Sequence, residues 1–206
     1  MKFLYAGFTA IIFFGAGMMA NSSGNPSWEN ITAAYDSAQR LGDYDTIEHA
    51  FDLASEYSEA HPRDGRAMTY RGSLAAMIAR ESILPWRKLS SLKEGIDLMD
   101  DGVAAVVAER QSASTRMEIE VRMVRGTTSA RIPKLFGRGS TARADFKAVI
   151  NHPLFSSISP AHQASAYAWL AVLTARENDT SNSQTYLQKA RLANADTANT
   201  IWTRYQ

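Results

Sequence analysis

A pattern of small and apolar residues recurs four times along this chain and restricts what it can fold into. In each copy, a bulky apolar residue lies four positions after one small or apolar residue and three positions before another. The copies are Ile47-Phe51-Ala54, Gly95-Met99-Gly102, Ala142-Phe146-Val149 and Ser183-Leu187-Ala190, with starts 48, 47 and 41 residues apart. Offsets of four and three place side chains on one face of a helix. The repeat predicts stacked helical hairpins, which bury their apolar faces against neighbours.

Apolar periodicity and its interruptions predict an all-α fold. Glycine and proline mark most of the helix ends, as at Gly42 and Pro62, because proline cannot continue the backbone ladder. No segment of adequate length alternates with period two, which is the pattern of a strand. The expected helices cover residues 27–40, 44–60, 66–82, 88–108, 116–131, 142–150, 160–176 and 181–193, with a short ninth at 197–205. Trp86, in the break before the fourth helix, is expected to pack beneath its loop.

Two of the expected helices contain an interior glycine. Gly72 follows Tyr70-Arg71, and Gly126 follows Val124-Arg125. Glycine inside a helix costs about 1 kcal/mol relative to alanine. Close packing of a neighbouring helix is one reason to tolerate that cost, so both positions are expected at helix contacts.

The last hairpin resembles a tetratricopeptide repeat. Its first helix carries Tyr167, Leu170 and Ala171, and its second carries Ser183, Leu187 and Ala190. Residues 44–62 are similar to the second helix and closing proline of such a repeat, whereas the middle repeats exceed the usual length of about 34 residues. The resemblance implies that residues 21–206 form an α-solenoid of about four stacked hairpins. It also implies a concave surface that binds partners and performs no catalysis.

The first twenty residues have the pattern of a secretory signal peptide. Lys2 precedes 18 residues without a charge, and Ala20 is followed by a polar, turn-prone stretch. The alternative is an uncleaved anchor, since 18 residues is at the short end of the roughly 17–25 that span a bilayer. Both readings place the folded part outside the cytoplasm, in the periplasm, in the medium or tethered to the inner membrane. The chain has no cysteine, which excludes a lipoprotein anchor and favours a bacterial source.

The sequence contains no recognisable catalytic, metal or cofactor motif. The four histidines, His49, His61, His152 and His162, do not form the spacing of a zinc protease, and no serine lies in a nucleophile elbow. A net charge of +1 gives no reason to expect nucleic acid as a partner. We therefore expect a non-enzyme. The alternative is an exported enzyme whose site forms only in three dimensions, around His49 or His152.

Charge is distributed unevenly along the chain. Residues 21–65 contain nine acidic residues and two arginines, whereas residues 114–147 contain eight basic and three acidic residues. One interpretation is a pair of solvated faces with ion pairs inside the molecule, which contribute little to stability when exposed. The other is that the basic region binds an acidic protein or an anionic membrane surface, where complementary charge would speed encounter.

The loop at residues 132–139 is the sharpest candidate for a partner contact. Leu135 and Phe136 lie between Lys134 and Arg138, and apolar residues flanked by cations suit a partner or membrane surface. Alternatively, Phe136 folds back into the hairpin core. Gly139 precedes an expected helix, whose N-terminus could accept an anion. The candidate partner-binding residues are Arg122, Arg125, Arg131, Lys134, Leu135, Phe136 and Arg138.

These observations favour a scaffold or adaptor that mediates protein–protein interaction in the bacterial cell envelope. Its expected partner is another envelope protein with an acidic surface. The alternative in a different class is a membrane-tethered accessory subunit of an envelope transport or assembly complex, in which residues 1–20 would be retained.

Overall fold

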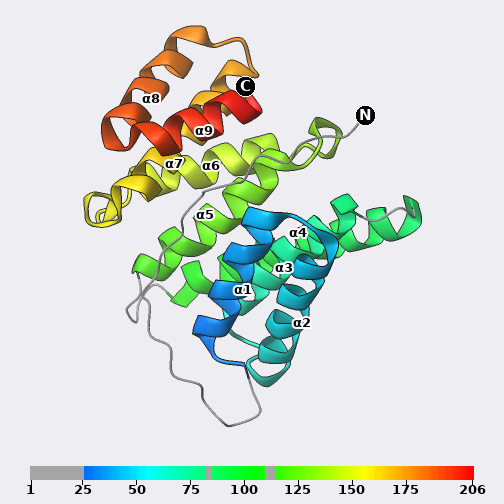
Figure 1. Ribbon diagram of the computed structural model, residues 1–206. Helices are drawn as coiled ribbons and strands as arrows, with labels where there is room; N and C mark the ends of the chain where they lie inside the picture. The colour runs from blue at the N-terminus through cyan, green and yellow to red at the C-terminus, as the bar shows by residue number, and fades with distance from the viewer. Residues whose placement is uncertain (1–25, 82–84, 110–114) are drawn as a thin grey trace. The chain divides into compact units, whose positions relative to one another are not determined.

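The computed structural model describes residues 26–81, 85–109 and 115–206, and these residues form helices and no strands (Figure 1). The all-α prediction is confirmed. The α-helices are α1 (Trp28–Leu41), α2 (Tyr44–Ala60), α3 (Gly65–Glu81), α4 (Pro85–Ala108), α5 (Thr115–Arg131), α6 (Gly139–Ile150), α7 (Pro160–Ala175), α8 (Thr180–Ala193) and α9 (Ala195–Tyr205). Two short 3₁₀ helices are η2 (Lys134–Phe136) and η3 (Phe155–Ser157). The expected signal peptide or anchor, residues 1–20, lies outside the described residues.

Local side-chain chemistry sets several helix ends where the sequence predicts them. Ser27 caps α1 by accepting a hydrogen bond from the Asn30 backbone N–H at 3.3 Å. Asp43 caps α2 by accepting one from the Thr46 N–H at 2.9 Å. Between them, Gly42 adopts a φ of 71° and donates its N–H to the carbonyl of Ala38, which ends α1. Glycine reaches this left-handed conformation without a steric cost, so α2 can begin after a turn of two residues.

The described residues divide into two compact units, one up to Asp101 and one from Gly102 onward. The first contains α1, α2, α3 and most of α4. An aromatic cluster fills its core, where the Tyr35 and Tyr70 rings are 4.6 Å apart and Trp28 meets Tyr70 edge to face. The Tyr35 hydroxyl lies 2.9 Å from the Ser73 hydroxyl, so this buried polar pair is satisfied.

Helices α3 and α4 approach each other closely at two glycines. A Cβ atom at Gly72 would lie 2.6 Å from the carbonyl oxygen of Gly95, and one at Gly95 would lie 2.5 Å from that of Gly72. The expected role of Gly72 in helix packing is confirmed. At Gly126 on α5, a Cβ would lie 3.1 Å from the ring of Phe146, so that position is also at a helix contact.

The second unit is organised around α7, which is buried along most of its length. Helix α7 packs against α6, α8 and α9. Phe146 and Trp169 stack with their ring centroids 6.3 Å apart and their planes nearly parallel. A smaller cluster joins the last turns of α4 to α5 through Val103, Val106 and Val121. This core holds the ends of α5, α7 and α9 in fixed positions.

The recurrent pattern identifies inward-facing positions. Eleven of its twelve residues are buried, and the exception, Phe51, is partly exposed. Phe51 lies beneath the Arg71 guanidinium, 5.9 Å from the ring centroid. The spacing therefore predicts which face of each helix is packed.

The expectation for Trp86 is wrong. The helix begins at Pro85, so Trp86 lies in the first turn of α4, and its side chain is 68% exposed. Proline is well tolerated in a first turn because the N–H that it lacks has no partner there. Over residues 26–81, 85–109 and 115–206, no helix combines the length and the apolar character required to cross a bilayer.

Candidate functional site

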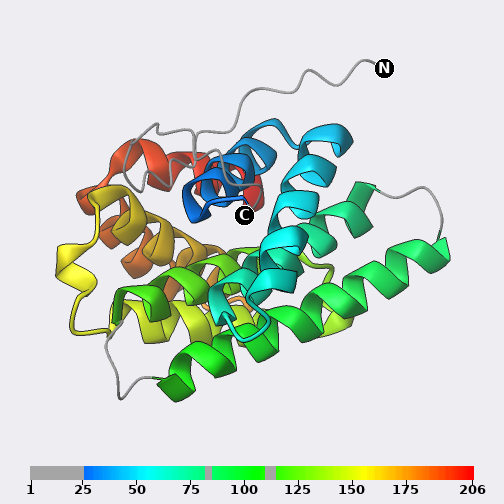
Figure 2. The same cartoon turned by 90° about the horizontal axis from the view of Figure 1, so that it is seen from below.

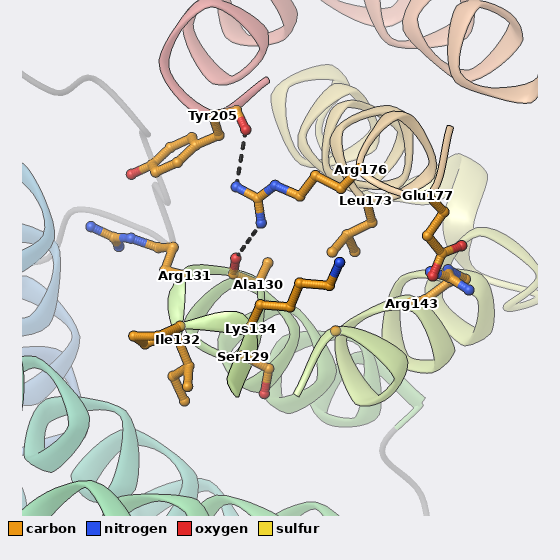
Figure 3. Close-up of a pocket in the computed structure, with 12 residues that line it drawn as sticks. Ser129, Ala130, Arg131, Ile132, Lys134, Arg143, Leu173, Arg176, Glu177 and Tyr205 are labelled. Carbon is orange, nitrogen blue, oxygen red and sulfur yellow. Dashed lines mark hydrogen bonds and ion pairs between the residues drawn. The ribbon is translucent and has the colours of Figure 1, made fainter. Parts of the chain in front are cut away.

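A pocket of about 360 Å³ lies in the second unit, where segments far apart in sequence meet. The end of α5, the loop at residues 132–139, the start of α6 and the ends of α7 and α9 surround it (Figure 3). Four of its side chains are cationic and one is a carboxylate. The lining residues are Ser129, Ala130, Arg131, Ile132, Pro133, Lys134, Gly139, Arg143, Leu173, Arg176, Glu177 and Tyr205.

Arg176, directly after α7, is held in place by two backbone carbonyls. Its Nη1 donates to the carbonyl of Ala130 at 2.8 Å, and its Nη2 donates to that of Tyr205 at 2.9 Å (Figure 3). Both acceptors are neutral, so these bonds orient the guanidinium without neutralising its charge. Partial burial lowers the pKa of Arg176 and Tyr205 raises it, but arginine keeps its proton at neutral pH. The result is a fixed positive charge at the pocket wall.

Lys134 and Arg131 contribute the charge on the side of α5. Lys134 begins η2 and is exposed, and its amine points across the pocket toward Leu173 (Figure 3). Within the described part of the chain, no carboxylate forms an ion pair with Lys134. Arg131 is the last residue of α5, and its guanidinium carbon lies 5.8 Å from the centre of the Tyr205 ring. The ring can orient that cation without removing its charge.

The opposite side of the pocket is closer to electrical balance. Arg143 on α6 forms an ion pair with Glu177, which follows α7 (Figure 3). Gly139, the first residue of α6, also lines the pocket, so the positive end of that helix lies beside it. The positive charge of this pocket that faces no carboxylate partner is therefore concentrated around Lys134 and Arg176.

This arrangement is suited to holding an anion. Ala130, Ile132 and Leu173 give the pocket an apolar wall, where a charged hydrogen bond is stronger than in bulk water. Arginine and lysine around such a wall can bind a carboxylate or a phosphate. The hydroxyl of Ser129, which also lines the pocket, points away from Lys134 and Arg176 (Figure 3).

Several of the residues predicted to bind a partner lie at this pocket or beside it. Arg131 and Lys134 line it. Leu135 is 81% exposed. Phe136 is partly buried, so it is neither fully exposed to a partner nor fully buried in the hairpin core. Arg138 is partly buried, and its carbonyl accepts the Ala142 N–H at the start of α6. Lys134 and Leu135 are thus the exposed members of the predicted set.

Arg122 and Arg125, also predicted to bind a partner, pair with a buried carboxylate instead. Arg125 donates from Nε and Nη2 to Asp145 at 2.8 and 2.7 Å, and Arg122 donates to the same carboxylate at 3.1 Å. Arg122 also donates to Glu118 at 2.9 Å. Asp145 is fully buried, so these charges are balanced between α5 and α6. We leave both arginines out of the candidate binding surface.

One of the two histidines named in the enzyme alternative, His152, lies next to this cluster. His152 is buried, and its Nε2 is 4.0 Å from Glu118 Oε2. Its Nδ1 accepts a hydrogen bond from the Leu154 N–H at 3.1 Å, which fixes the ring. His49 is exposed on α2. In the described ranges, no group of three or more acidic or histidine side chains is placed to hold a metal ion.

Sequence reasoning missed the residues that complete the pocket. Arg176 and Tyr205 are 45 and 74 positions beyond Arg131, and neither belongs to a motif. Only the packing of α7 and α9 brings them beside α5. A basic residue directly after an apolar helix is common, so its position alone gives no signal.

Comparison of the chain with protein-family models, with curated proteins and with solved structures found no match in any of the three.

Proposed function

We propose that this chain is a non-catalytic adaptor of the bacterial cell envelope, which binds an acidic segment of another envelope protein at the pocket. The observation that carries the proposal is the pair of cations formed by Lys134 and Arg176. Arg176 is oriented by neutral carbonyls, and Lys134 is exposed and directed across the pocket. Because Arg176 is already oriented before a ligand arrives, ordering of its side chain does not oppose binding.

The chemistry beside the pocket favours a peptide over an isolated small anion. Leu135 is 81% exposed next to Lys134, so a segment could place a carboxylate in the pocket and an apolar side chain on Leu135. An apolar contact rimmed by charge is a common arrangement in protein interfaces. The positive pocket would accelerate association with an acidic partner more than it would tighten the final complex.

The proposed scaffold is a tetratricopeptide-like solenoid of about four stacked hairpins over residues 21–206. It is supported by the burial of the recurrent pattern and by the close contact of α3 with α4. We further propose that the folded part is periplasmic or secreted after removal of residues 1–20. That location follows from the charge-free segment after Lys2.

A charge-reversal experiment tests the pocket directly. The probe is a fluorescein-labelled glutamate-rich peptide that contains one leucine, and binding is measured by fluorescence anisotropy. Lys134→Glu is expected to weaken binding by about tenfold, equivalent to about 1.4 kcal/mol. The matched control is Lys147→Glu, which makes the same charge change at an exposed position on α6 outside the pocket. Equal effects of the two variants would reject the pocket as the binding site.

A second experiment identifies the partner and tests the location. The full-length protein is crosslinked in cells, captured, and its N-terminus is measured by intact mass. An adaptor predicts a chain that begins at Asn21 and one dominant acidic partner, whose recovery falls in the Lys134→Glu variant. Retention of Met1 together with membrane components would instead support the tethered accessory subunit.

A further inference from the structure

Two large apolar side chains are exposed together at the start of α4. Trp86 is 68% exposed and Leu89 is 58% exposed. They are three residues apart, so they share one face of the helix. Leu92, three positions after Leu89, lies on the same side of the helix but is buried, as is Met99 farther along. The apolar side of α4 is therefore covered along the middle of the helix and exposed at its start.

The chain geometry places this surface at an outer end of the first unit. The end of α3 and the start of α4 extend beyond α1 and α2 in both views (Figures 1 and 2). Helices α3 and α4 are in close contact at Gly72 and Gly95. Pro85, the first residue of α4, lies ten residues before Gly95, which corresponds to about 15 Å of helix. The first turn of α4, which carries Trp86, therefore lies at that outer end.

The charges at this end are predominantly positive. Residues 85–92 include Arg87 and Lys88 and no carboxylate. The N-terminus of α4 adds the positive end of a helix dipole. Nearby carboxylates are paired, since Glu81 accepts from Arg80 at 2.6 Å and Asp97 accepts from Lys93 at 2.9 Å. An approaching surface therefore meets the apolar side chains of Trp86 and Leu89 beside the exposed Lys88.

We propose that the start of α4 binds an anionic lipid surface, with Trp86 and Leu89 inserted at the boundary between headgroups and acyl chains. Tryptophan favours that boundary, and lysine next to it favours anionic headgroups. A protein partner fits this end less well, because a stable interface buries about 800 Å² on each side and two side chains supply only part of that area. Shallow insertion into lipid needs no such extended surface.

Fluorescence quenching locates the contact. The full chain is mixed with vesicles of phosphatidylcholine and phosphatidylglycerol whose acyl chains are brominated, and tryptophan emission is recorded. The expected result is quenching that is lost in Trp86→Phe and kept in Trp202→Phe, the matched variant on α9. Any quenching caused by insertion of residues 1–20 is common to all three proteins. Equal quenching of the wild type and Trp86→Phe would overturn the proposal, as would equal quenching with phosphatidylcholine alone.

Co-sedimentation with the same anionic vesicles, without bromine, tests the energetics. The double variant Trp86→Ser and Leu89→Ser is expected to lower the partition coefficient by about tenfold or more. Leu192→Ser is the control, because Leu192 on α8 is 80% exposed and lies in the other unit. Circular dichroism checks that the exposed substitutions leave the helices intact. Self-association of the wild type that the double variant abolishes, without vesicle binding, would overturn the proposal in favour of a second copy as the occupant.

Discussion

Asp145, fully buried on α6, accepts two hydrogen bonds from the Arg125 guanidinium, one from Nε at 2.8 Å and one from Nη2 at 2.7 Å. Removing one partner of a buried ion pair leaves the other charge uncompensated, at a cost of about 3–5 kcal/mol. Arg122 also donates to this carboxylate. We expect Asp145→Ala to lower the free energy of unfolding by about 3 kcal/mol or more, measured by urea denaturation followed by circular dichroism.

The control for that prediction is an ion pair at the surface. Lys93 and Asp97 are 2.9 Å apart with both side chains largely exposed. Exposed pairs contribute about 0–1 kcal/mol, so Asp97→Ala should change the free energy of unfolding by no more than that. Similar losses in the two variants would show that burial does not strengthen the Asp145 pairing.

The close contact between α3 and α4 at two glycines predicts that adding a methyl group there destabilises the protein. Adding a methyl group at Gly72 places it 2.6 Å from the Gly95 carbonyl oxygen, so the helices must separate. Gly72→Ala should therefore destabilise the chain by about 1–3 kcal/mol, despite the better helix propensity of alanine. Gly139→Ala is the matched substitution, since nothing lies within 4 Å of its Cβ. Thermal unfolding of both variants compares them, and a stable Gly72→Ala protein would contradict the close approach.

Acid should weaken the fold through His162 on α7. Burial lowers the pKa of this histidine below its ordinary value of 6.5. As pH falls below 6.5, the unfolded state takes up a proton that the folded state excludes, so the free energy of unfolding decreases until the folded pKa is reached. The loss is about 1.4 kcal/mol for each unit between the two pKa values.

Denaturant titrations on both sides of that range measure the effect. His162→Gln should show a smaller decrease in the free energy of unfolding between neutral and acidic pH than the wild type does. His49→Gln is the control, because His49 is exposed on α2. The Ser159 hydroxyl lies 2.6 Å from His162 Nδ1 and loses this partner in His162→Gln, which changes the stability at every pH. The quantity to compare is therefore the change in the free energy of unfolding with pH.

Salt should separate the contributions of charge and apolar contact at the proposed binding pocket. Exposed charges are screened within about 10 Å at moderate ionic strength, so affinity for the acidic peptide should fall as salt is added. Lys134→Gln removes one of the pocket cations and should give a shallower dependence of affinity on salt. Leu135→Ser should weaken binding equally at all salt concentrations. The same salt dependence in Lys134→Gln and wild type would show that Lys134 does not contact the anion.

Much of the helical pattern can be predicted from the sequence, because it depends on local chemistry. Residues that cap or interrupt helices, such as Gly42 and Asp43, act through neighbours a few positions away. Burial of the recurrent pattern follows from helical spacing alone. Helix α6 begins at Gly139, three residues before the predicted start, because the loop ends in a single 3₁₀ turn closed by Gly137 at a φ of 69°.

The pocket and the buried ion pairs depend on tertiary packing, which a linear count of charges does not resolve. Arg122 and Arg125 belong to the same basic stretch as Lys134, yet the turn between α5 and α6 brings Asp145 against the first two. Trp86 differs from the prediction because α4 begins at Pro85, so its side chain lies in the first turn of a helix, where it is exposed. Composition alone distinguishes none of these environments.

The Gly72–Gly95 contact also determines where the chain can gain or lose residues. Both glycines must face each other, and a single inserted residue rotates everything beyond it by about 100° around the helix. An insertion between Gly65 and Gly72 would replace the glycine at the crossing with a residue that carries a side chain. Insertions in the connection after Glu81 leave Gly72 and Gly95 free to face each other. Length variants should therefore be accepted in the connections and rejected inside α3 and α4, although these helices contain few residues with a chemical role.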